Sequence, residues 1–311
     1  MYFILLGVIS VLVVTLAYIR LNRPIPNTIR IVNDKHIKPS STPLLILGVV
    51  KDVEDSFGES QKCLVKTLKS FPKSRIIIYE NNSEDGTKRV LRLFENSDPR
   101  VTCLCDHVKD SQMINLKSRM GKIAYARNQV LSYCKEKNLF HEYPCTVWID
   151  MDGGIWDIAS LHKTLHLDHH WDAIMANNHN KYYDAYALRN DEYPFGPEID
   201  DTFWVDIENG KRHGLYKEKD KLIPVWSAFS GLAIYKSEIF NKCTYEDVVT
   251  EEVVRTYNMI AEESKYKKDI EYINNSGYNF PVICEHVSLH FQMIQKGYDD
   301  LYIYTDLYYQ R

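Results

Sequence analysis

Residues 146–154 read TVWIDMDGG, a short apolar run followed by two acidic residues and two glycines. The run Thr146–Ile149 predicts a buried strand that ends directly before Asp150. In an extended segment residues i and i+2 point to the same side, so Asp150 and Asp152 can face one ligand. Two carboxylates this close repel each other, and a divalent cation relieves the repulsion. Oxygen ligands favour Mn²⁺ or Mg²⁺, so the segment predicts a metal site, with the glycines leaving room for the backbone to approach a ligand.

Apolar runs alternate with helical stretches on both sides of this segment. Alternation of this kind predicts an α/β fold, with a mostly parallel sheet and helices on both faces. The further strands are expected at Leu44–Val50, Arg75–Tyr79, Val101–Cys105 and Ala173–Ala176, and the helices at Glu59–Ser70, Glu84–Phe94, Lys122–Lys137 and about Asp157–Leu167.

The regular pattern fades between residues 178 and 222, which contain many Tyr, Asp and Gly residues. A loop of this length inside a compact domain indicates an active-site segment. Order is expected to return at Val225–Tyr235, in a helical region through Lys268, and at Val282–Gln295.

Composition limits the classes of protein that the chain can represent. The 311 residues include 38 Lys and Arg against 42 Asp and Glu, a formal net charge of −4, which excludes a general nucleic-acid binder. Hydrophobic residues at 45% and charged residues at 26% exclude a disordered or multi-span membrane protein. The 22 tyrosines suit either an ordinary core rim or a surface that contacts sugars.

The first 19 residues contain no charged side chain. As a helix they would reach roughly 28 Å, close to the ~30 Å thickness of the hydrocarbon core of a membrane. A signal peptide or a buried core helix is the alternative, but there is no basic residue before the run and no polar face along it. We expect a transmembrane anchor at 1–19, a stalk at 20–42 and a catalytic domain at 43–311.

The orientation of this anchor is predicted from charge and cysteine usage. Five cationic residues follow the span before residue 40, which places the rest of the chain in the cytosol rather than in the lumen. Seven cysteines without a CxxC pair fit reduced thiols better than a disulfide framework. A lumenal placement is the alternative.

Polar residues gather where the first two predicted strands end. Lys51 and Asp52 follow one strand, and Glu80 begins the run ENNSEDGT, which contains Asp85. Ligands of open parallel sheets bind outside the carboxyl ends of the strands, so a binding site is expected here. The alternative is that these side chains cap the helices that follow.

These segments together resemble the GT-A class of nucleotide-sugar glycosyltransferases over about residues 44–180. The likeness rests on the two polar strand ends, on the run KIAYARN that begins at Lys122, and on Asp150-Met-Asp152. Within that class, IAYARN and the later run WSAFSGLAIY from Trp226 resemble the fungal capsule-associated and cryptococcal mannosyltransferase family.

The resemblance implies a role for each segment. The backbone near Lys51 and Asp52, with the carboxylates of Glu80 and Asp85, would hold the base and ribose of a nucleoside-diphosphate sugar. Lys122 and Arg127 would offer cations to its diphosphate. Asp150 and Asp152 would hold Mn²⁺ or Mg²⁺. Apart from the resemblance, five aromatic residues are candidates to stack on the sugar rings of an acceptor: Trp226, Tyr182, Tyr183, Tyr186 and Trp204. The alternative is that they belong to the core, as an aromatic stripe more often does.

A second group of functional residues occurs in the run CEHVSLH at residues 284–290. His286 and His290 are spaced to share one helical face. By the resemblance, His290 or His286 completes the metal shell. Glu285 is the candidate general base if the enzyme inverts, and only orients the acceptor if it retains. A zinc site with Cys284, or plain core histidines, are the alternatives. The histidines at 162, 166, 169 and 170 are expected at the surface.

The leading hypothesis is a metal-dependent glycosyltransferase that moves a hexose, such as mannose, to a glycan, lipid-linked or protein-linked acceptor. A sugar-phosphate nucleotidyltransferase is the first alternative, although residues 49–53 contain no glycine for a phosphate loop. A membrane-tethered carbohydrate-binding protein without catalysis is the second.

Overall fold

A computed structural model describes residues 40–109, 118–178, 182, 184–200, 202–210, 218–263 and 282–311. The expected anchor at 1–19 and most of the stalk lie outside the described residues. Within the described ranges, no helix is both long enough and apolar enough to cross a membrane.

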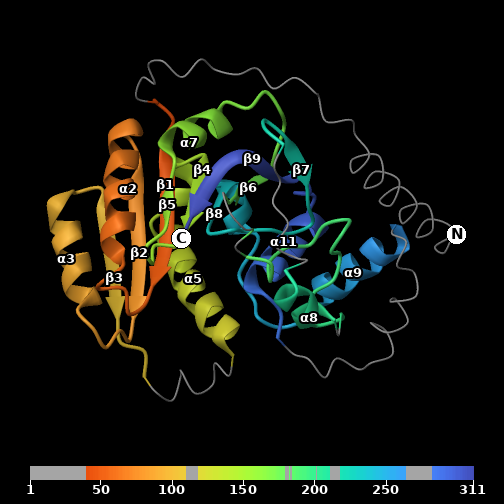
Figure 1. Cartoon of the computed structure of the whole chain (residues 1–311). Coiled ribbons are helices and arrows are strands. Elements are labelled where there is room, and N and C mark those ends of the chain that lie inside the picture. Colours follow the sequence, from red (N-terminus) through yellow and green to blue (C-terminus); the bar gives the residue numbers. More distant parts are fainter. Residues whose placement is uncertain are drawn as a thin grey trace, which may run out of the picture.

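The described chain forms one nine-stranded sheet, with β3 at one edge (Figure 1). The strands are hydrogen-bonded in the order β3-β2-β1-β4-β8-β6-β9-β5, and β7 also pairs with β9. Their bounds are β1 Leu44–Val50, β2 Arg75–Asn81, β3 Val101–Asp106, β4 Cys145–Ile149, β5 Ile155–Trp156, β6 Ala173–Asn177, β7 Leu222–Pro224, β8 Leu232–Lys236 and β9 Leu301–Gln310.

Helices connect the strands. They are α2 Phe57–Ser70, α3 Thr87–Ser97, α5 Arg119–Glu136, α6 Leu139–Glu142, α7 Ile158–Leu165, α8 Phe203–Glu208, α9 Glu251–Glu263 and α11 Glu285–Gln295, with a 3₁₀ turn, η2, at Ser237–Asn241.

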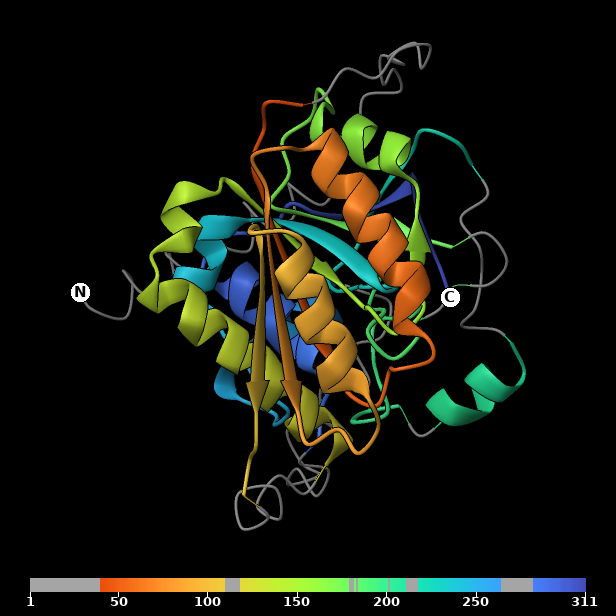
Figure 2. The same ribbon diagram turned by 90° about the vertical axis from the view of Figure 1, so that its left-hand side faces the viewer.

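Alternation along the buried strands builds two cores, one on each face of the sheet. In β1, Leu45 and Leu47 pack with apolar residues of α5, α9 and α11, whereas Leu44 and Ile46 pack with those of α2 and α3. Figure 2 shows α2 and α3 in front of the sheet, with the arrowheads of β2 and β3 pointing the same way. Because both faces are covered, the strands read as continuous apolar runs. The predicted α/β fold with helices on both faces is confirmed.

Strand direction divides the sheet into two parts. β1 is parallel to β2 and β4, and β2 is parallel to β3. β8 then lies antiparallel between β4 and β6, and β5 and β7 pair antiparallel with β9. The sheet is therefore mixed, and the expected mostly parallel arrangement describes its first part better than its second. Hydrophobicity alone carries no strand direction, which is why the sequence did not indicate these reversals.

The sheet brings distant segments to one edge. The ends of β1, β2 and β4 are neighbours in the parallel register, with Val50 opposite Glu80 and Leu47 opposite Trp148. The end of β9 arrives at the same place, because Ile155 of β5 pairs with Gln310. Figure 1 shows the C-terminal end of the chain beside β5. The loop at residues 150–154 is thus held between β4 and β9.

Candidate active site

A cavity of about 490 Å³ opens at this edge of the sheet. Charged side chains of both signs line it. The carboxylates are Asp150, Asp152, Asp184 and Glu285, and the cations are Lys51, Arg119, Lys122, Arg127 and Arg311. Eight of the predicted site residues therefore line one cavity: Lys51, Lys122, Arg127, Asp150, Asp152, Tyr186, Glu285 and His286.

Asp150 is held by its backbone at the end of β4. Its amide donates to the carbonyl of Gly231 at 2.9 Å, and the Tyr309 hydroxyl donates to its carbonyl at 3.0 Å. Burial, opposed by Arg127 and reinforced by the nearby carboxylates of Asp152 and Asp184, raises the pKa of its carboxyl from 3.8 to about 7. An ionised Asp150 carboxylate is therefore electrostatically unfavourable unless a cation lies beside it.

Asp152 has one paired and one unpaired carboxylate oxygen. Oδ2 lies 2.7 Å from Nη2 of Arg311, whereas Oδ1 is buried and has no hydrogen-bond partner among the described residues. An orphaned carboxylate oxygen is costly unless a cation or donor reaches it. The buried carboxylate of Asp150 and the unpaired oxygen of Asp152 together offer oxygen ligands that fit a hard divalent cation such as Mn²⁺ or Mg²⁺.

Of the two glycines after this pair, Gly154 serves a different purpose from the one expected. A Cβ atom on Gly154 would collide with the hydroxyl end of Tyr309, and one on Gly231 would collide with the side of the same ring. The room at Gly154 is therefore taken by Tyr309, a fully buried side chain of β9, rather than by a ligand. Through this ring and its hydrogen bond, β9 fixes the backbone that carries Asp150.

Arg127 is buried on α5 within a cage of three aromatic rings. Its guanidinium carbon lies 4.9 Å from the ring centre of Trp148, 5.0 Å from that of Phe229 and 5.3 Å from that of Tyr245. This geometry permits cation–π attraction on several sides. The cage fixes the guanidinium at one wall of the cavity.

The same guanidinium lies between two carboxylates. Its Nε is 3.4 Å from Oε1 of Glu285, and its Nη2 is 3.5 Å from Oδ1 of Asp150. Arg127 was expected to contact a diphosphate. In this structure it lies between these two side chains and balances their charge, and its contact with a diphosphate stays a prediction.

Glu285 begins α11 and is 5% exposed at its side chain. The next residue, His286, also lines the cavity, and its ring stacks on Phe229 with 3.8 Å between ring centres. Burial, and then the neighbouring Arg127, lower the pKa of His286 well below its usual value, so the imidazole is neutral. The start of α11 therefore presents one carboxylate and one neutral imidazole to the cavity.

His290 is not placed as a metal ligand, which corrects the expectation. One turn further along α11 it is fully buried, and it is not among the described residues that line the cavity. Its Nδ1 lies 2.9 Å from the Ser227 hydroxyl and its Nε2 lies 2.9 Å from the Tyr235 hydroxyl. Because both ring nitrogens lie within hydrogen-bond distance of hydroxyl groups, His290 is a core residue. It is therefore not available as a ligand for the alternative zinc site with Cys284.

Asp52 and Asp85 are used within the loops that follow β1 and β2. Asp52 accepts from the amide of Glu84 at 2.8 Å. Asp85 accepts from the amides of Glu54 and Thr87, each at 2.9 Å. Neither residue is among the described lining of the cavity, so the structure favours the capping alternative for both.

Glu80 is likewise not among the described residues that line the cavity. It is fully buried, its Oε1 accepts from the amide of Ser83 at 2.7 Å, and its Oε2 lies 3.8 Å from Nζ of Lys88. This side chain holds the loop after β2 in shape. One oxygen of the carboxylate thus serves the loop, and the contact of Glu80 with a ribose stays a prediction.

Trp226 does not reach a ligand either. It is buried in the core, and its amide donates to the carbonyl of Arg189 at 2.8 Å. The expectation that its ring stacks on an acceptor is therefore wrong for this structure. A Trp in an apolar run is read more simply as a core residue.

The long irregular segment does reach the cavity, as its length indicated, through Asp184 and Tyr186. Burial, and then the charge of Glu285, raise the pKa of Asp184 from 3.8 to about 6. Asp184 was missed as a site residue because nothing in its local sequence distinguishes it from a turn. The signal available was only the length of the loop.

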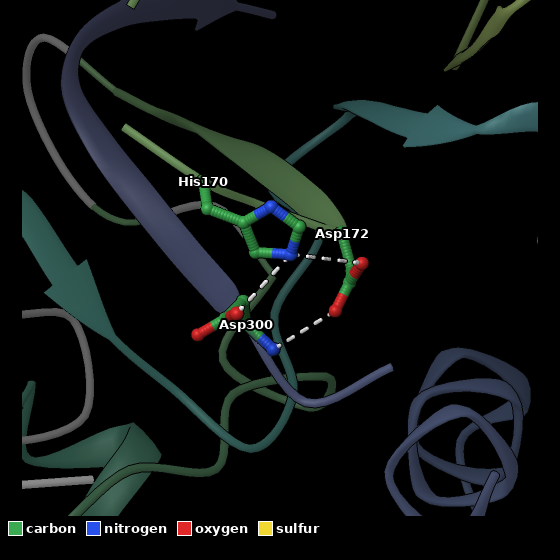
Figure 3. Close-up of side chains that lie close together, drawn as sticks. All are labelled: His170, Asp172 and Asp300. Atoms are coloured by element: carbon green, nitrogen blue, oxygen red, sulfur yellow. Dashed lines mark hydrogen bonds and ion pairs between the residues drawn. The ribbon is translucent and has the colours of Figure 1, made fainter. Parts of the chain in front are cut away.

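A second cluster of ligand-type side chains lies where β6 and β9 begin (Figure 3). His170, Asp172 and Asp300 bring their ligand atoms within 4.8 Å of one another. Lys236 already donates to Asp172 at 2.9 Å, and the amide of Asp300 donates to the same carboxylate at 3.2 Å. The cluster is best explained as an ion-pair network that joins the starts of two strands to the end of β8.

The expectation that the other histidines lie at the surface holds in part. His170 is 64% exposed at its side chain. His162 is buried instead, with its ring stacked on Phe71 at 4.2 Å between ring centres. Its helical position faces α2, which the sequence pattern did not reveal.

Comparisons with solved structures find glycosyltransferases of low identity. The mannosyltransferase PcManGT from Pyrobaculum calidifontis, solved with GDP-Man and Mn²⁺, is 15% identical over 80% of this chain and 59% of its own, with a TM-score of 0.42. TarS from S. aureus, residues 1–349 with UDP, is 13% identical over 86% of this chain and 59% of its own, with a TM-score of 0.45.

Core-mannan synthase A from Aspergillus fumigatus, in its Mn/GDP form, is 11% identical over 93% of this chain and 81% of its own, with a TM-score of 0.37. The chain thus spans about 59% of the length of the first two of these proteins. No curated protein matches the sequence.

A comparison with protein families gives a match over most of the chain. The model of the family described as cryptococcal mannosyltransferase 1 matches residues 51–296. This range contains every element from α2 to α11, and every cavity carboxylate and cation named above except Arg311. The chain therefore belongs to the cryptococcal mannosyltransferase family of glycosyltransferases.

Proposed function

We propose that the protein is a metal-dependent glycosyltransferase. It would move a hexose, mannose by its family, from a nucleoside-diphosphate sugar to a hydroxyl of a glycan, lipid-linked or protein-linked acceptor. The observation that carries the proposal is a single cavity in which Asp150 and Asp152 meet the cations Lys51 and Lys122. A paired carboxylate site beside exposed cations suits a metal-bridged diphosphate.

The donor half of the site is built from residues at the ends of β1 and β4 and the start of α5. Asp150 and Asp152 would hold Mn²⁺ or Mg²⁺, which when bound neutralises the charge that grows on the departing nucleoside diphosphate. Lys51, Arg119 and Lys122 are exposed at the cavity and attract the same anion by long-range electrostatics. The chain's own cations thereby bring the donor to the carboxylate pair.

The acceptor half contains the two remaining carboxylates. Glu285 is held in a fixed orientation by Arg127 and serves as the candidate base that takes the proton from the acceptor hydroxyl in an inverting reaction. If the anomeric configuration is retained, Glu285 orients the acceptor instead. Asp184 is available as a hydrogen-bond acceptor for a second hydroxyl.

Nucleotide binding should depend on the metal. In isothermal titration calorimetry on the full chain, we expect GDP or UDP to bind at least about tenfold more tightly with Mn²⁺ than with EDTA, because the metal offsets repulsion between the diphosphate and the carboxylates. Equal affinity in both buffers, for both nucleotides, would contradict the proposal.

The products separate the alternatives. With a panel of nucleotide sugars that includes GDP-mannose, a glycosyltransferase releases a nucleoside diphosphate and a free or transferred sugar. A nucleotidyltransferase given a sugar phosphate and a nucleoside triphosphate releases pyrophosphate, and a carbohydrate-binding protein yields neither product.

We also propose that residues 1–19 anchor the chain, that residues 20–42 form a stalk, and that the domain at 43–311 faces the cytosol. The support is the uncharged span followed by cations, and the seven cysteines, all of which are free thiols in the described residues. Protease added to intact membranes should degrade the domain. Protection of the domain until detergent is added would place it in the lumen.

A further inference from the structure

The helix α8 carries two exposed apolar side chains, with Trp204 56% exposed and Val205 55% exposed. Trp204 is nevertheless held in place. Its ring lies 5.8 Å from that of Tyr186 at an interplanar angle of 34°, and it meets the ring of Phe203 edge-on at 5.0 Å. An indole that is ordered by aromatic neighbours and still open to solvent is suited to bind a ligand by stacking.

This aromatic pair is continuous with the active-site cavity. Tyr186 lines the same cavity as Asp150 and Glu285, so the rings of Tyr186 and Trp204 lead from the cavity to the surface. Asp184, two residues before Tyr186, also lines the cavity. One ring of the stacking surface, Tyr186, and a hydrogen-bonding carboxylate, Asp184, therefore come from one short turn of the chain, and Trp204 of α8 supplies the second ring.

A buried ion pair braces this turn. Arg189 is fully buried, and its Nη1 donates to the carbonyl of Tyr186 at 2.9 Å while its Nη2 donates to Glu198 at 2.9 Å. Its Nε donates to the hydroxyl of Tyr257 at 2.9 Å, which links the turn to α9. Because these donors are satisfied in the core, the backbone that carries Tyr186 is fixed before any ligand arrives, which lowers the entropic cost of binding.

We propose that Tyr186 and Trp204 form a platform that binds a pyranose ring of a carbohydrate acceptor at the mouth of the cavity. The proposal rests on the glycosyltransferase function proposed above and names its acceptor class. A pyranose offers an apolar C–H face to an aromatic ring and hydroxyl groups to a carboxylate, and Trp204 and Asp184 supply that combination. The cavity cations Lys51 and Lys122 suit a diphosphate, so the part of the cavity lined by Tyr186 and Asp184 is assigned to the acceptor.

A lipid chain is a less suitable occupant. The exposed apolar surface consists of two side chains on a six-residue helix, and a carboxylate adjoins it at Asp184. Lipid binding takes a larger apolar area and disfavours a neighbouring negative charge. The observations therefore favour a sugar, and a lipid response is an outcome of the test that would overturn the proposal.

The first test compares transfer with hydrolysis in the same enzyme. With GDP-mannose as donor and α-linked mannobiose and mannotriose as acceptor probes, Trp204→Ala should lower the ratio of transfer to donor hydrolysis about tenfold, through a raised acceptor KM. Trp204→Phe should restore part of the ratio, because it keeps a ring. Val205→Ala is the matched control on the same helix and should leave the ratio unchanged.

The second test reads binding directly and separates the two proposals. The indole N–H resonance of Trp204, assigned by its loss in Trp204→Ala, should shift on addition of α-mannobiose and not on addition of phosphatidylcholine vesicles. An unchanged ratio in Trp204→Ala, no shift with either oligosaccharide, or a shift with vesicles alone would overturn the acceptor platform. Failure of the proposed function itself would be recognised by the absence of nucleotide binding and donor hydrolysis in the unmodified chain.

Discussion

Asp150→Asn is expected to remove Mn²⁺-dependent donor hydrolysis and transfer, with a fall in kcat/KM of about 10²–10³ or more. Asparagine keeps the shape of the side chain and one carbonyl oxygen but removes the negative charge that would hold the metal. Asp152→Asn should have a similar effect, because its buried Oδ1 is the oxygen without a hydrogen-bond partner among the described residues. The measurement is steady-state release of nucleoside diphosphate across a Mn²⁺ titration.

Asp150→Asn should leave the free energy of unfolding unchanged or higher. The pKa of Asp150 is raised in the folded state, from 3.8 to about 7, so ionising this carboxyl favours the unfolded chain. The destabilisation of the folded state by this ionisation is absent below about pH 4, grows between about pH 4 and 7, and is constant above that range. Thermal unfolding in EDTA should therefore show Asp150→Asn equal to the unmodified chain at low pH and equal or higher in Tm at pH 8.

A surface carboxylate provides the control. Asp55→Asn changes the charge by the same amount at an exposed position in the loop that follows β1, and it should alter neither activity nor Tm by a measurable amount. Loss of activity accompanied by a fall in Tm at pH 8 would mean that Asp150 supports the fold rather than the metal. Full activity in the Asp150→Asn, Asp152→Asn double variant would remove the proposed metal site altogether.

The sequence predicts those parts of the fold that are formed by uninterrupted runs of apolar residues. Leu44–Val50 and Thr146–Ile149 are apolar without interruption because both faces of the sheet are covered, and their ends locate Lys51 and Asp150 at one edge. Helical spacing predicts α5 from Lys122, three residues after its start at Arg119, and an ordered segment from Val282, three residues before the start of α11 at Glu285. Each of the site residues Lys51, Asp150, Lys122 and Glu285 lies within two positions of a strand end or within the first turn of a helix.

Side-chain direction is what the sequence does not reveal. Glu80 and Asp85 stand in the run that resembles a donor-binding loop, yet their carboxylates accept hydrogen bonds from loop amides. His290 has a suitable spacing from His286, yet its ring is fully buried in the core. Such outcomes depend on contacts between segments more than 20 residues apart, such as Asp85 with Glu54 and His290 with Ser227.

The contribution of β9 is the largest feature that went unrecognised. The run LYIYTDLYYQ has the alternation of a strand. Nothing in its local sequence shows that this strand pairs with β5 and supports residues 150–154. Tyr309 makes that link through a hydrogen bond to Asp150 and through close packing against Gly154 and Gly231. This link predicts a large effect from a very small change.

Gly231→Ala should destabilise the protein by about 3–5 kcal/mol, the sum of two separate costs. The backbone at Gly231 has φ +84°, a region that side-chain-bearing residues rarely adopt. A Cβ atom there would also collide with the ring of Tyr309, which is fully buried and has no space to swing out. The measurement is the free energy of unfolding from urea denaturation, with activity followed in parallel because the displaced ring would move Asp150.

Gly297→Ala isolates the first of these costs. Gly297 has nearly the same φ, +83°, but a Cβ there would meet no heavy atom within 4 Å, so only the backbone strain of about 1 kcal/mol should be seen. The second cost should depend on the ring, and Gly231→Ala should therefore be less damaging when Tyr309→Leu is already present. Equal losses for Gly231→Ala and Gly297→Ala, or the same loss in both Tyr309 backgrounds, would show that the ring does not press on Gly231. Support of the Asp150 loop by β9 would then rest on the hydrogen bond of Tyr309 and on the pairing of β5 with β9.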